Sequence, residues 1–520
     1  MPAEPRVNWR PMLAVLAMGG VMIGVAGLIA RGEQDPGSAG APTSTTSTVP
    51  DAAEPSEGGP VSGPDETTTT TTLRLPEREP DTVPAWTVGL PWGETVGLTM
   101  FRGNPTRTWY GTGPLPETAP EVAWRYPDGP MCGSSSEGGA TRTWCGTGWT
   151  GQPVIWERPD NVTEVIFGAY DKSVHFVDAA TGRSLRPPFR TGDIIKGSVT
   201  LDPDGYPLLY FGSRDNKLRI VALDRDEPTE LWSLHANEVK GIWNDDWDGN
   251  PVIVDDIMYE GGENSWFFAV ELNRGYAADG KVVVDPRIVF KMPGWTDELI
   301  AKVGRNVSIE NSPAVFEQRV YFANSGGRVV GLDVSRVREG DVDIVLDYWV
   351  GDDVDATIVV DREGMIYVSV EDERKNARSR ELGQLIKLDP YRPDDPYVWG
   401  VPVPGGSGDG GLWATPALGD GVLYASTHTG ELLVVDTDTG EVVWEDSIGW
   451  HAWSSPVIVD ERLLVATCSG ELRLYSIEDP RSPRRLWSIQ GSESCIESTP
   501  AVWEGVIYVG ARDGYFRAYR

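Results

Sequence analysis

The chain has 520 residues, a formal net charge of −33, 60 glycines and 21 tryptophans. This acidity argues against a nucleic-acid partner, because phosphate binding depends on clustered Lys and Arg side chains that release counterions, and the sequence has no basic stripe. Short runs of Val, Ile and Leu between Gly, Asp and Asn turns predict an all-β protein after residue 31.

Residues 11–30 are uncharged and mostly apolar, and as a helix they would be about 30 Å long, which is the thickness of a bilayer core. Arg6 and Arg10 precede this stretch and Glu33 follows it, so the positive-inside rule predicts that residues 1–10 are cytoplasmic and the rest is extracytoplasmic. A cleaved signal peptide with a site near Ala26 is the alternative. The length of the apolar run favours an uncleaved signal anchor, that is, one transmembrane helix in the cell membrane.

Residues 31–85 are rich in Ser, Thr, Pro and Glu and include six consecutive threonines at 67–72. Such a segment has too few apolar side chains to offset the entropy of ordering, so we expect a disordered linker. Its prolines and like charges keep it extended. It would act as a stalk that holds residues 86–520, the folded part, away from the membrane.

A pattern of about 50 residues recurs along the folded part: a small polar start, an apolar strand, a turn, two more strands, and often Asp, Thr-Gly and Trp. The clearest copy is residues 414–444, ATPALGDGVLYASTHTGELLVVDTDTGEVVW. A unit of four short strands cannot bury its own faces, so the units must pack around an axis as a β-propeller. The eight starts are Gly151, Gly197, Gly249, Asn311, Ala356, Ala414, Ser454 and Ser498.

The eighth unit ends at Arg520, before its fourth strand. Residues 120–127 (PEVAWRYP) supply a matching strand, with Trp124 at the position of Trp444 and Trp487 in other units. The sequence therefore predicts an eight-bladed β-propeller of four-stranded antiparallel blades, whose last blade is closed by an N-terminal strand that removes the open edge. Bulky tryptophans at this repeat position are expected to pack between blades; the full set is Trp124, Trp232, Trp399, Trp444 and Trp487.

The period and the D-x-x-T-G-x-x-x-W ending resemble the repeats of the quinoprotein-like (PQQ-like repeat) propeller family over about residues 98–520. That family includes quinone-dependent alcohol dehydrogenases and the propeller lipoprotein of outer-membrane β-barrel assembly, so the resemblance implies a fold and leaves enzyme and scaffold open. Residues 101–116 are also similar to the lead-in segment of secreted members. The dehydrogenases carry a vicinal cysteine pair over their cofactor, which this chain lacks, so PQQ is not expected.

The four cysteines test the predicted topology, because the turn between the second and third strands of a blade opens on the same face as the loop to the next blade. We call this face the top. Cys132 and Cys145 lie in the top loop before the first blade, Cys468 lies in the second turn of blade 7, and Cys495 lies in the loop to blade 8. Of the three pairings, the topology selects Cys132–Cys145 and Cys468–Cys495. An extracytoplasmic setting makes disulfides the expected state.

The residue just before each inner strand should face the axis at the top, and at four starts it is a carboxylate: Asp248, Glu310, Asp355 and Glu497. Converging carboxylates are typical of a hard cation such as Ca²⁺, so these residues are the candidate metal ligands. The alternative is that they solvate the funnel mouth, cap loops or pair with Lys196 and Arg305.

Aromatic and polar side chains also gather in the top loops, where long insertions at 233–248, 291–310, 371–384 and 400–413 add to the surface. Aromatics with polar neighbours can stack on sugar rings or anchor a peptide, although packing between blades is the alternative. The candidate top-face binding residues are Trp413, Trp450, His451, Trp453, Glu263 and Asn264.

No G-x-S-x-G, H-E-x-x-H or P-loop pattern occurs, and no catalytic residue is assigned. The sequence therefore predicts a membrane-tethered, extracytoplasmic binding or scaffolding propeller that presents its top face to a protein or a cell-envelope glycan. No cofactor is expected, with Ca²⁺ as the exception to test. The alternative is a cation- or quinone-dependent enzyme that uses the carboxylates at the funnel mouth.

Overall fold

The computed structural model describes residues 83–520 except 138–139 and 150. The predicted membrane helix at 11–30 and the stalk up to residue 82 lie outside the described residues. Val83 is fully buried and its backbone pairs with Glu317, so residues 83–85, which the sequence assigned to the stalk, already belong to the folded part. Within the described residues, no helix has both the length and the apolar character needed to cross a bilayer.

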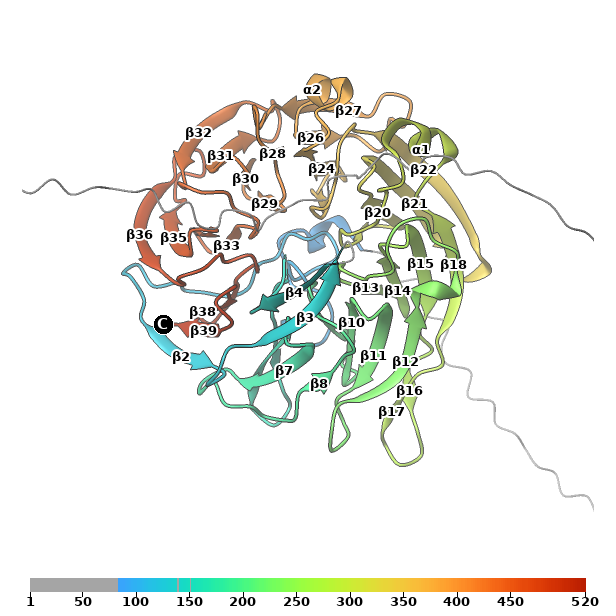
Figure 1. Cartoon of the computed structure of the whole chain (residues 1–520), viewed down its shortest axis with the longest axis vertical. Coiled ribbons are helices and arrows are strands. Elements are labelled where there is room, and N and C mark those ends of the chain that lie inside the picture. The colour runs from blue at the N-terminus through green and yellow to red at the C-terminus, as the bar shows by residue number, and fades with distance from the viewer. Residues whose placement is uncertain (1–82, 138–139, 150) are drawn as a thin grey trace, which may run out of the picture. The chain divides into compact units, whose positions relative to one another are not determined.

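Eight antiparallel sheets surround a central axis, as predicted (Figure 1). The first four blades, each from inner to outer strand, are blade 1 with β5 (Val154–Glu157), β6 (Thr163–Ala169), β7 (Ser173–Asp178) and β8 (Phe189–Arg190); blade 2 with β9 (Thr200–Leu201), β10 (Leu208–Ser213), β11 (Lys217–Ala222) and β12 (Thr229–His235); blade 3 with β13 (Val252–Val254), β14 (Ile257–Gly261), β15 (Trp266–Glu271) and β18 (Arg287–Pro293); and blade 4 with β19 (Ala314–Phe316), β20 (Arg319–Ala323), β21 (Arg328–Arg336) and β22 (Asp341–Trp349).

The remaining blades continue round the ring. They are blade 5 with β23 (Val359–Val360), β24 (Ile366–Ser369), β26 (Leu385–Leu388) and β27 (Tyr397–Val401); blade 6 with β29 (Ala417–Leu418), β30 (Val422–Ser426), β31 (Glu431–Asp436) and β32 (Val442–Ser447); blade 7 with β33 (Val457–Val459), β34 (Arg462–Ala466), β35 (Glu471–Ser476) and β36 (Arg484–Gln490); and blade 8 with β37 (Ala501–Trp503), β38 (Val506–Gly510), β39 (Phe516–Tyr519) and β2 (Val122–Tyr126).

The ring closes as the sequence predicts. β2 pairs with β39, with Trp124 opposite Ala518, and Figure 1 shows these two strands side by side at the C-terminus. The Trp124 indole is buried and its Nε1 donates to the carbonyl oxygen of Ala179 in blade 1, 2.9 Å away. The Trp399 and Trp487 side chains are also buried, whereas those of Trp232 and Trp444 are only partly buried.

Aromatic side chains join neighbouring blades through their faces. The rings of Phe167 in blade 1 and Phe516 in blade 8 stack with centroids 4.0 Å apart, and those of Phe267 in blade 3 and Phe322 in blade 4 stack at 4.4 Å. Stacked rings bury large apolar areas, so the core of this protein lies between blades rather than inside them.

A chain of hydroxyl groups links successive blades near the axis. At six of the eight repeat starts, the next residue donates its backbone N–H to the side chain at the same position of the following blade. For example, Thr357 donates to Thr415 (3.0 Å), Thr415 to Ser455 (3.0 Å), and Ser455 to Thr499 (3.2 Å). This geometry explains why the repeats begin with small polar residues. A buried N–H needs an acceptor, and a Ser or Thr Oγ reaches it without filling the axis.

Residues 83–116, which we call the lead-in segment, cross the axis on the bottom face, the face opposite the top, and contact several blades there. Its strand β1 (Gly97–Leu98) pairs with β5, and the short helix η1 (Ala85–Thr87) precedes it. Arg102 and Arg107 are fully buried at the axis. Arg102 donates to the carbonyl oxygens of Pro416 (2.7 Å) and Pro456 (3.0 Å), which precede the inner strands of blades 6 and 7.

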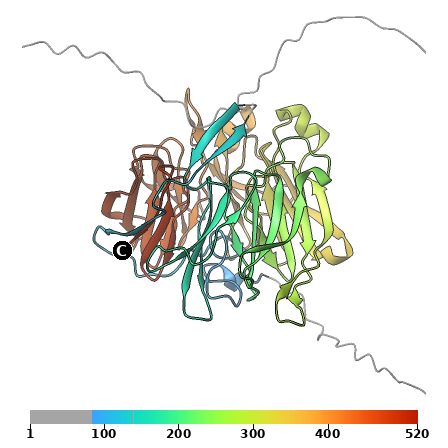
Figure 2. The same ribbon diagram turned by 60° about the horizontal axis from the view of Figure 1, so that its bottom comes forward.

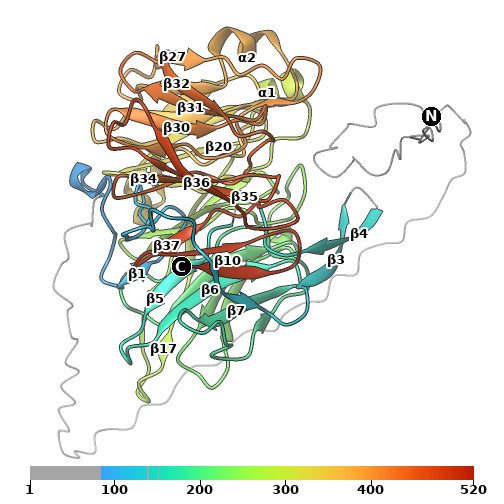
Figure 3. The ribbon, with the colours of Figure 1, turned by 90° about the vertical axis from the view of Figure 1, so that its left-hand side faces the viewer.

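Figures 2 and 3 show a hairpin standing out from the top, on the side opposite the lead-in segment. It consists of β3 (Cys132–Glu137) and β4 (Ala140–Cys145), and the Cys132–Cys145 disulfide joins its base. The second disulfide joins Cys468 to Cys495, so both predicted pairings are confirmed.

The insertions form the remaining elements. The top loops contain η2 (Ala236–Glu238), α1 (Asp297–Val303), α2 (Ala377–Leu382) and the pair β25 (Glu371–Asp372) with β28 (Gly410–Gly411); elsewhere lie the hairpin β16 (Gly275–Tyr276) with β17 (Val282–Val283) and the short helix η3 (Val337–Glu339).

Candidate functional site on the top face

Carboxyl groups from blades 2 to 5 gather at the top of the axis. We define the acidic cluster as Asp246, Asp248, Glu263, Glu310, Asp352, Asp353, Asp355, Glu371 and Glu373. Oxygen atoms of Asp248, Glu263 and Glu310 lie within 4.8 Å of one another. Lys196, from the loop between blades 1 and 2, forms an ion pair with Asp248, and its Nζ lies 3.6 Å from Glu263 Oε1. The cluster therefore already contains one ammonium group.

The blade 5 side of the cluster is linked to this trio by Ser325. Its Oγ donates to Asp355 Oδ1 at 3.3 Å and lies 3.5 Å from Glu310 Oε1. Asp353 Oδ1 and Glu371 Oε1 are buried and have no hydrogen-bond partner among the described residues. Buried carboxylate oxygens normally have a partner, so these two atoms indicate a place where a cation or donor from outside would be stabilised.

Burial makes these carboxyl groups hard to ionise. It raises the pKa of Glu310 to about 7; the Lys196 ammonium opposes this shift, whereas Asp248 and Asp353 reinforce it. Burial likewise raises the pKa of Asp353 to about 7 against the effect of Arg374, and it raises the pKa of Glu371 well above its usual range. Several acids of the cluster are therefore protonated near neutral pH, and a bound cation would release those protons.

Cations are fewer than carboxyl groups in this region. Arg214 Nε lies 2.5 Å from Asp246 Oδ2, and Arg374 Nη1 lies 3.4 Å from Asp352 Oδ1 and 3.5 Å from Asp353 Oδ2. With Lys196, these are the basic groups that pair with the cluster in the described part of the chain. The local charge is therefore negative wherever the acids ionise.

Glu497, the fourth candidate metal ligand, lies in a different arrangement. Its Oε1 accepts from Arg512 Nη1 at 2.8 Å, and Arg512 Nε donates to the carbonyl oxygen of Cys145 at the base of the hairpin. The Arg512 guanidinium also lies 5.0 Å from the Trp144 ring centroid. Of the four candidate metal ligands, the structure therefore brings Asp248 and Glu310 together, with Glu263 as a third carboxylate. Asp355 is connected to Glu310 through Ser325. Glu497 instead forms an ion pair with Arg512.

Four aromatic rings stack beside the acidic cluster, and we call them the aromatic stack: Trp413, His428, His451 and Trp453. Trp413 and Trp453 have centroids 5.0 Å apart and an interplanar angle of 9°. Trp453 Nε1 donates to His428 Nδ1 at 3.0 Å, and the two imidazoles stack at 4.9 Å. Burial lowers the pKa of both histidines to about 4, so both are neutral at physiological pH.

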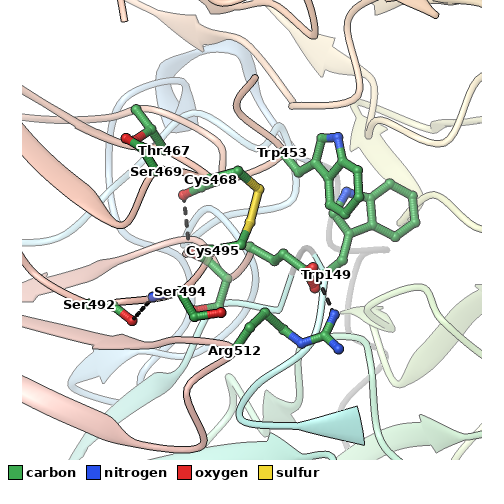
Figure 4. The surroundings of a disulfide bond; sticks show 12 residues. Trp149, Trp453, Thr467, Cys468, Ser469, Ser492, Ser494, Cys495 and Arg512 are labelled. Atoms are coloured by element: carbon green, nitrogen blue, oxygen red, sulfur yellow. Dashed lines mark hydrogen bonds and ion pairs between the residues drawn. A yellow bond between two sulfur atoms is a disulfide. The ribbon is translucent and has the colours of Figure 1, made fainter. Parts of the chain in front are cut away.

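Figure 4 shows Trp149 and Trp453 to the right of the Cys468–Cys495 disulfide and Arg512 below Cys495. The Trp149 ring meets Trp413 edge-on at 6.5 Å. Sequence reasoning did not identify Trp149 or Arg512 as members of this site. Both lie in segments outside the strands that align between repeats, so the repeat pattern gave no signal for them.

The other candidate binding residues differ in exposure. Trp450 is 46% exposed, whereas Trp413 and Trp453 are each 8% exposed and Glu263 belongs to the acidic cluster. Asn264 is fully buried: its Nδ2 donates to the Ala236 carbonyl and its Oδ1 accepts from Trp266 N, so it supports a top loop.

Comparison with known proteins finds a similarity in the C-terminal part of the chain. Residues 383–520 match the family model described as outer membrane protein assembly factor BamB. A curated protein of that description from Xanthomonas campestris pv. campestris is 35% identical over 68 residues, which are 13% of this chain and 16% of the relative. The match thus spans about a sixth of the relative's length.

Solved structures agree on the fold. The quinohemoprotein alcohol dehydrogenase of Comamonas testosteroni is similar with a TM-score of 0.53 and 14% identity, over 81% of this chain and 80% of that chain. The quinohemoprotein alcohol dehydrogenase ADHIIG of Pseudomonas putida HK5 gives a TM-score of 0.56 and 11% identity, over 82% and 80%. At such identities the likeness concerns the fold alone. The folded part of this chain is an eight-bladed β-propeller, and its residues 383–520 are similar to PQQ-like repeats.

Proposed function

We propose that this protein is an extracytoplasmic binding or scaffolding propeller, tethered to the membrane by residues 11–30, which presents its top face to a protein or a cell-envelope glycan. The observation that supports this function most directly is the combination of the acidic cluster with the aromatic stack and the exposed Trp450. A rigid ring that carries acids and indoles on one face is suited to hold a ligand between them.

The partner group that fits this face carries positive charge. Most of the acids are buried, and in their ionised forms they repel one another, so an incoming ammonium or guanidinium group would relieve that repulsion. Indole faces attract the same groups through their quadrupoles. A protein partner would supply Lys or Arg side chains, and a glycan partner would supply amino groups or sugar faces for Trp450.

Site-specific crosslinking of the full chain in its membrane would test this function. A photo-reactive residue in place of Trp450 is compared with one in place of Tyr276, which is 57% exposed on the β16–β17 hairpin. We expect adducts at position 450 that are absent at 276, or cosedimentation with purified envelope polysaccharide that Trp450→Ala reduces. Equal labelling at both positions, together with no cosedimentation, would contradict the proposal.

A divalent cation site is the second candidate, favoured by the oxygens of Asp248, Glu263 and Glu310 within 4.8 Å. Ca²⁺ takes six to eight oxygen ligands, and the neighbouring Asp353 and Asp355 could add to the three. A cation there would have to displace or share Asp248 with Lys196.

The cysteines do not match the vicinal pair of the quinone-dependent dehydrogenases. The disulfide nearest the aromatic stack joins Cys468 and Cys495, which are 27 residues apart.

A further inference from the structure

A groove of about 690 Å³ opens between blades 5 and 6 on the bottom face, opposite the acidic cluster. Asp361 and Tyr367 of blade 5 form one side, Thr437 and Asp438 of blade 6 form the other, and Val88 of the lead-in segment lies at one end. This volume falls within the range of about 300–1,000 Å³ that is usual for ligand pockets. The groove plays no part in the function proposed above.

Blade 2 contains the same constellation at the equivalent repeat position. Tyr210 pairs with Thr200 across the inner strands, just as Tyr367 pairs with Val359, so Asp202 and Asp361 are equivalent. Tyr210 OH donates to Asp202 Oδ2 at 2.6 Å, and Tyr367 OH donates to Asp361 Oδ2 at 2.8 Å.

The two carboxylates also match in their backbone contacts. The other oxygen of Asp202 accepts from the N–H of Asp204 at 2.9 Å, and the other oxygen of Asp361 accepts from the N–H of Glu363 at 3.0 Å. Each blade therefore offers a second acid two residues after the first. We call each set of a Tyr-bonded Asp and the acid two residues later a socket. The two sockets share these contacts, although Asp361 Oδ1 also accepts from the N–H of Met365 at 2.9 Å.

In blade 2 the socket is filled by an arginine of the neighbouring blade. Arg274 Nη1 lies 2.8 Å from Asp202 Oδ2, Nη2 lies 2.7 Å from Asp204 Oδ2, and Nε lies 2.6 Å from Asp256 Oδ1. The Arg274 side chain is only 4% exposed. Its guanidinium is also 4.9 Å from the Tyr206 ring centroid.

Blade 6 supplies no such arginine. Arg274 is three residues beyond Glu271, the last residue of β15, and Thr439 is at the same distance from Asp436, the last residue of β31. Lys387 lies in the groove, but its Nζ donates to the Thr437 carbonyl at 2.9 Å. Arg362 also lines the groove, and its Nη2 donates to the Val88 carbonyl at 3.4 Å. Among the described residues, neither Arg362 nor Lys387 lies within ion-pair distance of the Asp361 carboxylate.

We propose that the groove between blades 5 and 6 binds an arginine side chain of a partner protein. The guanidinium would take the place that Arg274 takes in blade 2, with two parallel hydrogen bonds to Asp361 and Glu363. Planar, bidentate pairing of this kind favours arginine over lysine. Asp420 and Asp438 on the blade 6 side add negative charge, and Met365 and Leu418 offer apolar surface to the arginine methylenes.

Peptide binding to the full chain, purified in detergent, tests this assignment. The probes are acetyl-Ala-Arg-Ala-amide and its citrulline and lysine counterparts. Because a charged hydrogen-bonded pair is lost, we expect the citrulline peptide to bind about tenfold more weakly than the arginine peptide, and Asp361→Asn to weaken arginine binding by about the same factor. No saturable binding of the arginine peptide, or equal binding of arginine and citrulline, would overturn the proposal.

Asp438→Arg provides a variant that does not touch the buried Asp361. Asp438 is exposed in the turn between β31 and β32, so an arginine there can enter the groove from within the chain and should exclude the peptide. Asp226→Arg places the same charge change in the equivalent exposed turn of blade 2 and should leave binding unchanged. Equal losses in both variants would mean a general charge effect and would refute the site.

Two further variants distinguish peptide binding in this groove from binding at the top face, and from occupation of the groove by arginines of the chain itself. Trp450→Ala alters the top face and should leave arginine binding intact, so failure of the top-face function and failure of this site are distinguishable. Arg74 and Arg78 precede Val83 in the sequence. If Arg74→Gln with Arg78→Gln tightened peptide binding, the chain's own arginines would be the occupant and the assignment to a partner would be wrong.

Discussion

The Arg107 guanidinium donates to the carbonyl oxygen of Pro313 through two nitrogens, Nε at 2.9 Å and Nη2 at 2.6 Å, although 206 residues separate the two in the chain. The same guanidinium donates to the carbonyl of Phe101 and to the side-chain and backbone oxygens of Asn250. One side chain of the lead-in segment therefore holds blades 3 and 4 at the axis.

Arg107→Met should destabilise the propeller markedly. The change leaves several buried carbonyl oxygens without donors, so we expect the free energy of unfolding to fall by about 3 kcal/mol. Urea unfolding monitored by tryptophan fluorescence measures it. Arg287→Met is the matched control, because the Arg287 side chain is 61% exposed, and it should change little. Equal losses of unfolding free energy in the two variants would show that the buried hydrogen bonds of Arg107 do not stabilise the propeller.

The stability of the propeller should fall between about pH 5 and pH 8. Burial raises the folded-state pKa of Glu310 and Asp353 to about 7, against about 4 in the unfolded chain. The stability that these groups contribute is fully present below the unfolded pKa and is lost as the pH rises through 7. Each group accounts for at most about 3 kcal/mol.

Melting temperatures across this pH range provide the measurement. Glu310→Gln should flatten the profile and raise the melting temperature at pH 8, because the amide cannot ionise. Glu271→Gln is the control, since arginines lower the pKa of Glu271 and it titrates below this window. A profile that Glu310→Gln leaves as steep as that of the wild type would contradict the assigned cause.

Calcium should bind at the acidic cluster if the second candidate function is correct. Calorimetric titration of the full chain is expected to show one saturable site at pH 8, where the acids are ionised, and about tenfold weaker binding at pH 6 because protons compete. Glu263→Gln with Glu310→Gln should abolish the heat. Glu497→Gln should keep it, since Glu497 binds Arg512 instead. The absence of heat in the wild type at pH 8 would reject the cation site.

Removal of the Cys468–Cys495 disulfide should lower stability. It closes a loop of 27 residues, for which the chain-entropy model gives about 3 to 4 kcal/mol. Thermal unfolding of Cys468→Ser with Cys495→Ser measures the loss. Ser469→Ala, in the same turn, provides a control that keeps the disulfide. Wild-type stability in the double variant would mean that the top loops are held by their other contacts.

Much of the architecture could be predicted because it depends on local periodicity. Alternating apolar residues, the Asp and Thr-Gly turns and the missing last strand determine the number of blades and the closure by β2. The disulfide pairings followed, because the topology places both cysteines of each pair on the top face. These inferences need only the order of the strands.

The candidate site could be predicted only in part. Asp248 and Glu310 were identified from their place before the inner strands. Glu263, from a turn of blade 3, was not identified as a member of the same group, and Glu497 forms an ion pair with Arg512 instead of joining it. The direction of a loop side chain depends on long-range packing, which one sequence does not reveal. Arg102 and Arg107 were missed as buried residues, since arginine is rarely buried without an acid partner.

The sequence by itself determined the repeat, the number of blades, the pairing of the cysteines and the acidic character of the chain. Only the tertiary structure decided which carboxyl groups meet and that the lead-in segment fills the axis. It also decided that, within residues 83–520 as described, no arginine pairs with Asp361 as Arg274 pairs with Asp202 in blade 2. The physical reason is that periodic strands form from short-range patterns of apolar residues, whereas a binding site forms from loops whose neighbours in space are far apart in the chain.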